Sequence, residues 1–334
     1  MNLKTIVYLI LLGMIWGCSF LFQRIIVPVI GSGMTGAGRM VLAALTLVTV
    51  LVLLRRPLQW RARWKDYLLV GSVVMGLPLL CFAFAAHSLP AGYLAVLNAT
   101  VPMFAVLIGW GQGTRPSSSK LAGVFVGILG VATLVKFGDL AMTWQTALGF
   151  AATLAATLMY AIGAIMARKR FGNTDPLVMT AGNLIAGSLP LLPLAAVTAP
   201  AVLPSGGVIG ALLALGIVCT GVAYALYFSI LKEAGVERAT TVTFLVPLFA
   251  QLWGSLFLHE QVTWAFAIGC ALVLFAVALI FERVPGFARS VAGRDAVSRG
   301  TVLGHNVAFR SQGRGLKLLL QPPEGLFPGR THRP

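Results

Sequence analysis

Long apolar runs separated by short polar breaks dominate residues 5–282. No residue with a fixed charge lies between Asp66 and Arg115, and none lies between Asp175 and Lys232. A helix needs about 20 mostly apolar residues to cross a hydrocarbon core of roughly 30 Å, so each uncharged window is long enough for two crossings. Proline and glycine supply a turn inside each window, at "HSLPAGY" (87–93) and at "TAPAVLPSGG" (198–207).

This pattern predicts an all-α integral membrane protein with ten transmembrane helices. The predicted spans are 5–26, 31–54, 67–86, 91–111, 120–137, 144–167, 177–197, 207–231, 239–258 and 262–282. Composition agrees with this class, because 58% of the residues are hydrophobic, only 10% are charged and the mean hydropathy is +0.90. Soluble domains average roughly 45–50% apolar and about 25% charged residues, so a soluble globular domain is excluded.

The net charge of +16 indicates topology rather than a nucleic-acid partner, since no basic patch is interleaved with stacking aromatics on a soluble fold. Short loops rich in Lys and Arg stay in the cytoplasm. With ten helices, these basic residues all fall on one side: Lys4, Arg55, Arg56, Arg61, Arg63, Lys65, Arg115, Lys120, Arg168, Lys169, Arg170, Lys232, Arg238 and Arg283. The other side has Arg24 and Lys136 at helix ends, so both termini are expected to be cytoplasmic.

The first apolar run follows Lys4 and resembles a signal peptide, with "IWGC" (15–18) near a lipoprotein cleavage box. Trp16 stands where a small residue is normal, and the run continues to Phe22, so we expect an uncleaved first helix. The four cysteines all fall within predicted helices and have no CxxC spacing, which indicates neither a disulfide framework nor a metal site. No cofactor is expected.

The chain contains an internal repeat, since "VPMFA" (101–105) returns as "VPLFA" (246–250), displaced by 145 residues. At a displacement of 144, three further pairs align: "GRM" (38–40) with "GNL" (182–184), Trp16 with Tyr160, and Arg24 with Arg168. The order indicates two five-helix repeats, at 5–137 and 144–282. An odd number of helices inserts the second copy from the opposite side, an inverted architecture that in transporters places the binding site near the midplane.

The order of segments, the "WG" at 16–17, Arg39 in the second helix, the proline-bearing fourth and ninth helices and Glu260 together resemble the EamA family of the drug/metabolite transporter superfamily. The resemblance covers about residues 5–282. It implies a multi-pass carrier of the bacterial inner (plasma) membrane that exports amino acids, related amphipathic metabolites or drugs by alternating access. The chain departs from the pattern at Arg115, which the repeat aligns with Glu260, so no acidic pair occupies those two ends.

Arg39 lies about 12 Å from the outer end of the second helix, where a charge costs about 2.5–3.5 kcal/mol. One interpretation is a cation that faces a central cavity and binds a carboxylate of the substrate. The other is a charge that snorkels or bonds backbone carbonyls in "GSGMTGAGR" (31–39). No acidic residue within the predicted helices offers itself as a partner.

Other polar and aromatic residues at helix centres are candidates to line a binding cavity: Trp16, Asn98, Tyr160, Asn183, Tyr224, Tyr227 and Gln251. For each of them taken alone, packing or an interhelical hydrogen bond is the ordinary role. Pro102 and Pro247 occupy repeat-related positions and are predicted to bend their helices as gating elements. His87 and Glu260, in outward turns, are the candidates for coupling to protons, with a solvated cap as the ordinary alternative.

The sequence lacks HExxH, P-loop and rhomboid-like Gly-x-Ser-Gly motifs, so we expect no enzyme. The expected partners are a small-molecule substrate, membrane lipid and protons, in a monomer or homodimer. Two alternatives stay open: a flippase for lipids or lipid-linked sugars, which needs a lateral, lipid-open cavity, and a non-transporting sensor, which needs a sizeable soluble domain. The basic tail at 283–334 is predicted to be a disordered cytoplasmic segment.

Overall fold

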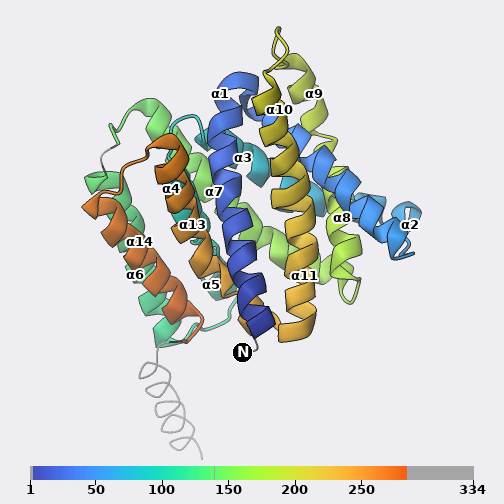
Figure 1. The fold of residues 1–334 in the computed structure, drawn as a ribbon. Coiled ribbons are helices and arrows are strands. Elements are labelled where there is room, and N and C mark those ends of the chain that lie inside the picture. The colour runs from blue at the N-terminus through green and yellow to red at the C-terminus, as the bar shows by residue number, and fades with distance from the viewer. Residues whose placement is uncertain (1–2, 139, 284–334) are drawn as a thin grey trace, which may run out of the picture. The chain divides into compact units, whose positions relative to one another are not determined.

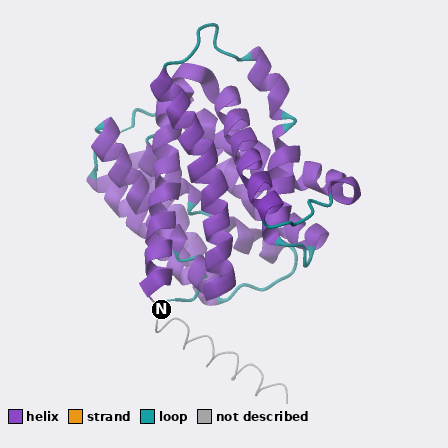
Figure 2. Ribbon diagram, turned by 45° about the vertical axis from the view of Figure 1, so that its right-hand side comes forward, coloured by secondary structure: helices purple, strands orange, loops and turns teal. Residues whose placement is uncertain are grey.

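The computed structural model describes residues 3–138 and 140–283, and within them all regular structure is helical (Figure 2). The first half contains α1 (Leu3–Leu53), α2 (Trp60–Gly71), η1 (Ser72–Gly76), α3 (Leu77–Ala85), α4 (Ala91–Asn98), α5 (Val101–Gly111) and α6 (Ser118–Phe137). The second half contains α7 (Trp144–Phe171), α8 (Pro176–Ser188), α9 (Leu191–Val197), α10 (Gly206–Leu213), η2 (Ala214–Val222), α11 (Ala223–Ala234), α12 (Val236–Ala239), α13 (Val242–Leu258) and α14 (Trp264–Ile280). The tail predicted to be disordered lies, from residue 284 on, outside the described residues.

Within that part of the chain, seven helical stretches are long and apolar enough to cross a membrane, or eight if α8 and α9, bent by 43°, form one span. The prediction of an all-helical, multi-pass membrane protein is therefore confirmed. The predicted spans 5–26 and 31–54 lie in one 51-residue helix, α1, with a kink at Gly31, whose φ of 74° suits glycine. Figure 1 shows α1 rising from the N-terminal end and then turning away toward α2.

Glycines allow the close packing of α1 against α13 and of α6 against α14, which lie side by side in Figure 1. A methyl group on Gly17 of α1 would lie 2.7 Å from the Phe249 Cβ and 2.8 Å from the Ala250 backbone nitrogen. On the other pair, a methyl on Gly123 would lie 2.8 Å from the Ala276 carbonyl oxygen. Both contacts show that these glycines allow helices to pack closely within the bundle.

We expect Gly17→Ala to lower the free energy of unfolding by about 1–3 kcal/mol, because the new methyl overlaps backbone that cannot rotate away. Thermal unfolding of the detergent-solubilised protein measures this. Gly109→Ala is the matched control, since a methyl there has no neighbour within 4 Å and Ala favours a helix. Equal midpoints for the two variants would contradict the close α1–α13 contact.

The π-helical segments η1 and η2 interrupt related helices of the two predicted repeats. Displacing η1 by 144 residues places it on residues 216–220, inside η2. π-helical turns are rare and occur often at functional sites. Here they shape two helices that both reach the central cavity described below.

Pro102 coincides with a short break in the predicted fourth helix at 91–111, which still forms one apolar stretch, Ala91–Gly111, long enough to cross a membrane. The structure ends α4 at Asn98 and begins α5 at Val101, with Pro102 in its first turn. The break has a physical reason. The ring of Pro102 clashes with the backbone carbonyl of Asn98, four residues earlier, and Pro102 has no N–H to donate to that carbonyl. Pro247 lies inside its helix, α13, so the two repeat-related prolines have different positions relative to the helix ends.

Candidate functional site

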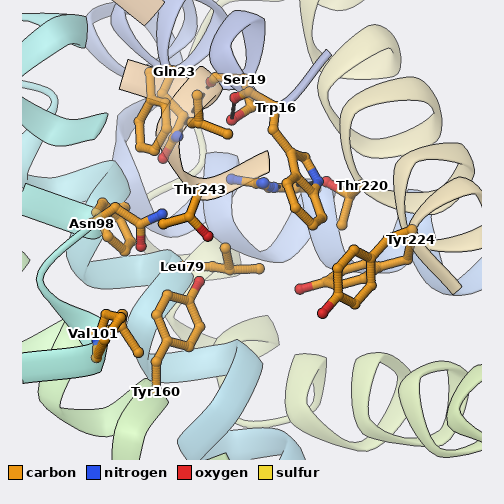
Figure 3. Close-up of a pocket in the computed structure, with 16 residues that line it drawn as sticks. Trp16, Ser19, Gln23, Leu79, Asn98, Val101, Tyr160, Thr220, Tyr224 and Thr243 are labelled. Atoms are coloured by element: carbon orange, nitrogen blue, oxygen red, sulfur yellow. Dashed lines mark hydrogen bonds between the residues drawn. The ribbon is translucent and has the colours of Figure 1, made fainter. Parts of the chain in front are cut away.

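A cavity of about 390 Å³ lies among α1, α3, α4, α5, α7, η2, α11 and α13. Its lining consists of Trp16, Ser19, Phe20, Gln23, Arg39, Leu79, Phe82, Asn98, Val101, Pro102, Tyr160, Thr220, Tyr224, Tyr227, Thr243 and Val246. The labelled side chains in Figure 3 converge on this space from both halves of the chain. We call it the central cavity. Its volume falls within the range of roughly 300–1,000 Å³ that is typical of small-molecule sites.

Seven of the residues singled out from the sequence meet at the central cavity: Trp16, Arg39, Asn98, Pro102, Tyr160, Tyr224 and Tyr227. Five lie outside its lining: His87, Asn183, Pro247, Gln251 and Glu260. The repeat-related pair Trp16 and Tyr160 lies at the cavity together, whereas only one member of the pair Arg39 and Asn183 does.

Arg39 is only 8% exposed and presents the one fixed charge in the cavity lining. Its Nε donates to the Thr220 Oγ1 at 2.8 Å, and Thr220 in turn donates to the Leu215 carbonyl oxygen, five residues back in η2. Among the described residues, no ion pair involves Arg39. The π-helical turn therefore holds one edge of the guanidinium, and no carboxylate of the described chain neutralises its charge.

Aromatic rings form the wall beside this charge. The Trp16 ring lies 5.4 Å from the Tyr227 ring and 6.1 Å from the Tyr224 ring, centroid to centroid. The Tyr160 ring stacks on Phe82, with centroids 6.1 Å apart and an interplanar angle of 27°. Flat apolar faces next to one buried cation suit an amphipathic organic anion better than an inorganic one.

Two residues that line the cavity have backbone carbonyls without their usual helical donors. Pro102 cannot donate to the Asn98 carbonyl, and Pro247 cannot donate to the Thr243 carbonyl, because proline has no N–H. Asn98 and Thr243 are separated by 145 residues, the displacement of the repeat, and both line the cavity. The side-chain amide of Asn98 has no hydrogen-bond partner in the described part of the chain. The repeat thus places two residues with freed backbone acceptors in the cavity lining, one from each half of the chain.

The lining also contains four polar residues that were not predicted from the sequence: Thr243, Thr220, Gln23 and Ser19. The 145-residue displacement from Asn98 points to Thr243 and was available in the sequence. Gln23 is 1% exposed and its Nε2 donates to the Ser19 carbonyl, while its Oε1 has no partner in the structure. Nothing in the local sequence distinguishes Thr220, Gln23 and Ser19 from ordinary polar positions in a helix.

Asn183 and Gln251 are held in helix contacts away from the cavity lining. Asn183 of α8 is 1% exposed, and its backbone packs so closely on α2 that a methyl on Gly71 would lie 2.3 Å from the Asn183 carbonyl oxygen. Gln251 of α13 donates to the Ser255 Oγ at 3.0 Å and packs over Gly92 of α4. For both residues the alternative stated from the sequence, packing or an interhelical hydrogen bond, describes the observed contacts.

Glu260 joins three segments through its carboxylate. Its two oxygens accept the Ala91 N–H at 3.1 and 3.0 Å at the start of α4, and the Arg24 Nε lies 3.4 Å from one of them. The Arg24 Nη1 also donates to the Ala86 carbonyl at 2.7 Å. The Glu260 side chain is only 8% exposed, so it is a buried cap of α4 rather than the solvated cap considered from the sequence. We call this set of contacts the Arg24–Glu260 latch.

His87 is exposed in the turn after α3. Partial burial lowers the pKa of its imidazole from the ordinary 6.5, and the positive charge of Arg24 lowers it further. Since the folded state resists protonation more than the unfolded state, the free energy of unfolding should decrease as the pH falls through and below about 6.5.

We therefore expect the thermal midpoint of the wild-type protein to decrease more steeply between pH 7.5 and 5 than that of His87→Gln. Scanning fluorimetry in detergent at matched ionic strength measures both curves. Parallel curves across this range would show that His87 contributes nothing to the pH dependence of stability.

The chain is similar to known proteins both in sequence and in fold. A family model described as the EamA-like transporter family matches residues 3–136 and again residues 147–282. A WAT1-related chloroplastic protein of Arabidopsis thaliana is 28% identical over 79% of this chain and 66% of its own length. A probable amino-acid metabolite efflux pump of Escherichia coli (strain K12) is 25% identical over 82% of this chain and 93% of its own. One solved crystal structure shares the fold with a TM-score of 0.60 at 18% identity, covering 84% of this chain and 96% of that chain.

Proposed function

Since this chain belongs to the EamA-like transporter family, we propose that it is a secondary transporter that exports amino acids or related amphipathic carboxylates, by alternating access through the central cavity. The family consists of transporters, which agrees with the absence of enzyme motifs noted in the sequence. We further propose that the chain acts in the inner (plasma) membrane of a bacterial cell.

Arg39 is the observation that carries the proposed substrate class. It is buried, faces the central cavity and forms no ion pair within the described chain. A buried, unneutralised arginine is expensive in a membrane protein, and a carboxylate offers bidentate, charge-assisted hydrogen bonds that offset this cost. A cationic drug would instead meet a like charge, so drugs of that class are disfavoured as substrates.

The acceptor groups at Asn98 and Thr243 support an amino acid over a simple carboxylic acid. An ammonium group needs acceptors, and carbonyl oxygens freed in broken membrane helices coordinate cations in other transporters. The rings of Trp16, Tyr224 and Tyr227 then suit an apolar or aromatic side chain. The name of the Escherichia coli relative, a probable amino-acid metabolite efflux pump, agrees with this choice.

We propose ten membrane crossings with cytoplasmic termini, counting α1 as two and adding α8–α9 and α14 to the long stretches. Four ion pairs support this topology, because each joins segments assigned to the cytoplasmic side: Lys4–Glu233, Arg56–Asp175, Lys120–Glu282 and Arg170–Asp66. The Arg24–Glu260 latch joins two turns assigned to the opposite side. We propose that this latch closes the outer end of the pathway and must open for release.

Uptake into proteoliposomes and inverted membrane vesicles tests the proposal, first with a mixed pool of amino acids and cationic drugs, with and without a pH gradient. A chemical series then tests recognition: phenylalanine, 3-phenylpropionate, which lacks the ammonium group, and phenethylamine, which lacks the carboxylate. We expect phenylalanine to accumulate best and phenethylamine least. A pool from which nothing accumulates above empty vesicles would refute export, and a preference for phenethylamine would refute the role of Arg39. Dependence of uptake on the pH gradient would support proton coupling.

A further inference from the structure

A second cavity, also of about 390 Å³, lies between the end of α1, the start of α8 and α11. No residue lines both this cavity and the central cavity. We call it the lateral groove. Residues of α11 line both cavities, but the transport proposed above does not involve the lateral groove.

The lateral groove is apolar along its walls and basic at one end. Val50, Leu54 and Phe228 are among its apolar lining residues, whereas Arg56 and Lys232 mark the end near the helix termini. Arg56 forms an ion pair with Asp175. Lys232 is exposed and has no ion pair among the described residues, so the mouth of the groove keeps a net positive charge.

This basic end belongs to the same end of the bundle as the other positively charged loops. Lys4 pairs with Glu233, the residue next to Lys232, and the Arg170–Asp66 pair joins the last turn of α7 to α2. Basic residues at one end of a membrane bundle lie at the level of the lipid headgroups, and anionic lipids attract them by about 1 kcal/mol for each Lys or Arg. The apolar walls of the lateral groove suit one acyl chain of a lipid. The charge of Lys232 at its end suits an anionic headgroup.

We propose that the lateral groove binds an anionic phospholipid, with an acyl chain along Phe228 and the headgroup phosphate held by Lys232 and Arg56. Binding of this lipid would also affect transport. The Phe228 ring stacks on Tyr224, with centroids 6.1 Å apart and an interplanar angle of 17°, and Tyr224 lines the central cavity. An acyl chain packed on Phe228 would therefore help to hold the Tyr224 ring in place at the central cavity.

Native mass spectrometry of the full chain in detergent tests the proposal, with phosphatidylglycerol and phosphatidylcholine of identical acyl chains as probes. We expect phosphatidylglycerol to bind more tightly, and Lys232→Gln to weaken it about fivefold while leaving phosphatidylcholine unchanged. Lys120→Gln is the control, because Lys120 is paired with Glu282 and lies away from the groove. Lys232 is exposed, so its replacement does not threaten folding.

Equal retention of the two lipids, or equal losses in Lys232→Gln and Lys120→Gln, would overturn the proposal. Displacement of bound phosphatidylglycerol by phenylalanine would assign the groove to substrate and overturn it as well. The measurement requires no transport, so a failure of the export proposal and a failure of the lipid proposal are distinguishable.

Discussion

Arg39→Gln should decrease kcat/KM for a transported amino acid by about 10- to 100-fold. The estimate follows from losing charge-assisted hydrogen bonds worth about 1.5–3 kcal/mol between the guanidinium and the substrate carboxylate. The kcat/KM of Arg39→Lys should lie between those of the wild type and Arg39→Gln, because a lysine keeps the charge but not the planar pair of donors. Initial uptake rates in proteoliposomes, normalised to reconstituted protein, measure all three.

The stability of the same variants separates a binding role from a structural one. Arg39 is buried without an acidic partner in the described chain, so replacing it by a neutral amide removes a desolvation cost. We expect Arg39→Gln to unfold at the wild-type temperature or above it. A variant that loses stability and retains carboxylate transport would assign Arg39 to the fold and remove it from the site.

Glu260→Ala should lower the free energy of unfolding by about 3 kcal/mol. Removing this carboxylate leaves Arg24 without its partner and the first turn of α4 without its acceptor, and breaking a buried ion pair costs about 3–5 kcal/mol. We use the lower end because the Arg24 side chain is 27% exposed. Chemical denaturation or thermal unfolding in one detergent measures the change.

Glu282→Ala provides the matched control, since Glu282 and Lys120 form an ion pair with a distance of 3.8 Å and side chains 45% and 40% exposed. Exposed pairs contribute about 0–1 kcal/mol. If Glu260→Ala and Glu282→Ala lose similar stability, the Arg24–Glu260 latch does not bind the three segments together in the way the structure indicates.

Helix positions followed from the sequence because charges and turn residues mark both ends of most spans. The predicted span 144–167 corresponds to α7, Trp144–Phe171, and 120–137 to α6, Ser118–Phe137. The break between α4 and α5 did not follow, although Pro102 determines it through its clash with the Asn98 carbonyl. A proline in a membrane helix is compatible with a bend or a break, and the neighbouring helices decide which forms.

The lining of the central cavity followed from the sequence only where a residue type has few alternatives in a membrane. A charge or a polar ring has to meet polar or aromatic neighbours, and the lining contains Arg39, Trp16, Tyr160, Tyr224 and Tyr227. Asn183 and Gln251 were predicted to line the cavity but lie outside its lining. Helices that are apolar on every side give no periodic signal that shows toward which neighbour a polar residue faces. The contacts of Asn183 with Gly71 and of Gln251 with Gly92 come from tertiary packing.

Counterflow in proteoliposomes is the measurement that tests alternating access through the central cavity most directly. Vesicles loaded with unlabelled phenylalanine are diluted into a trace of labelled phenylalanine, with no ion gradient. We predict a transient accumulation of label above equilibrium in wild-type vesicles and its loss in Arg39→Gln, because a carrier exchanges one bound substrate for another. Label that only equilibrates in wild-type vesicles, or accumulates equally in Arg39→Gln vesicles, would contradict the account.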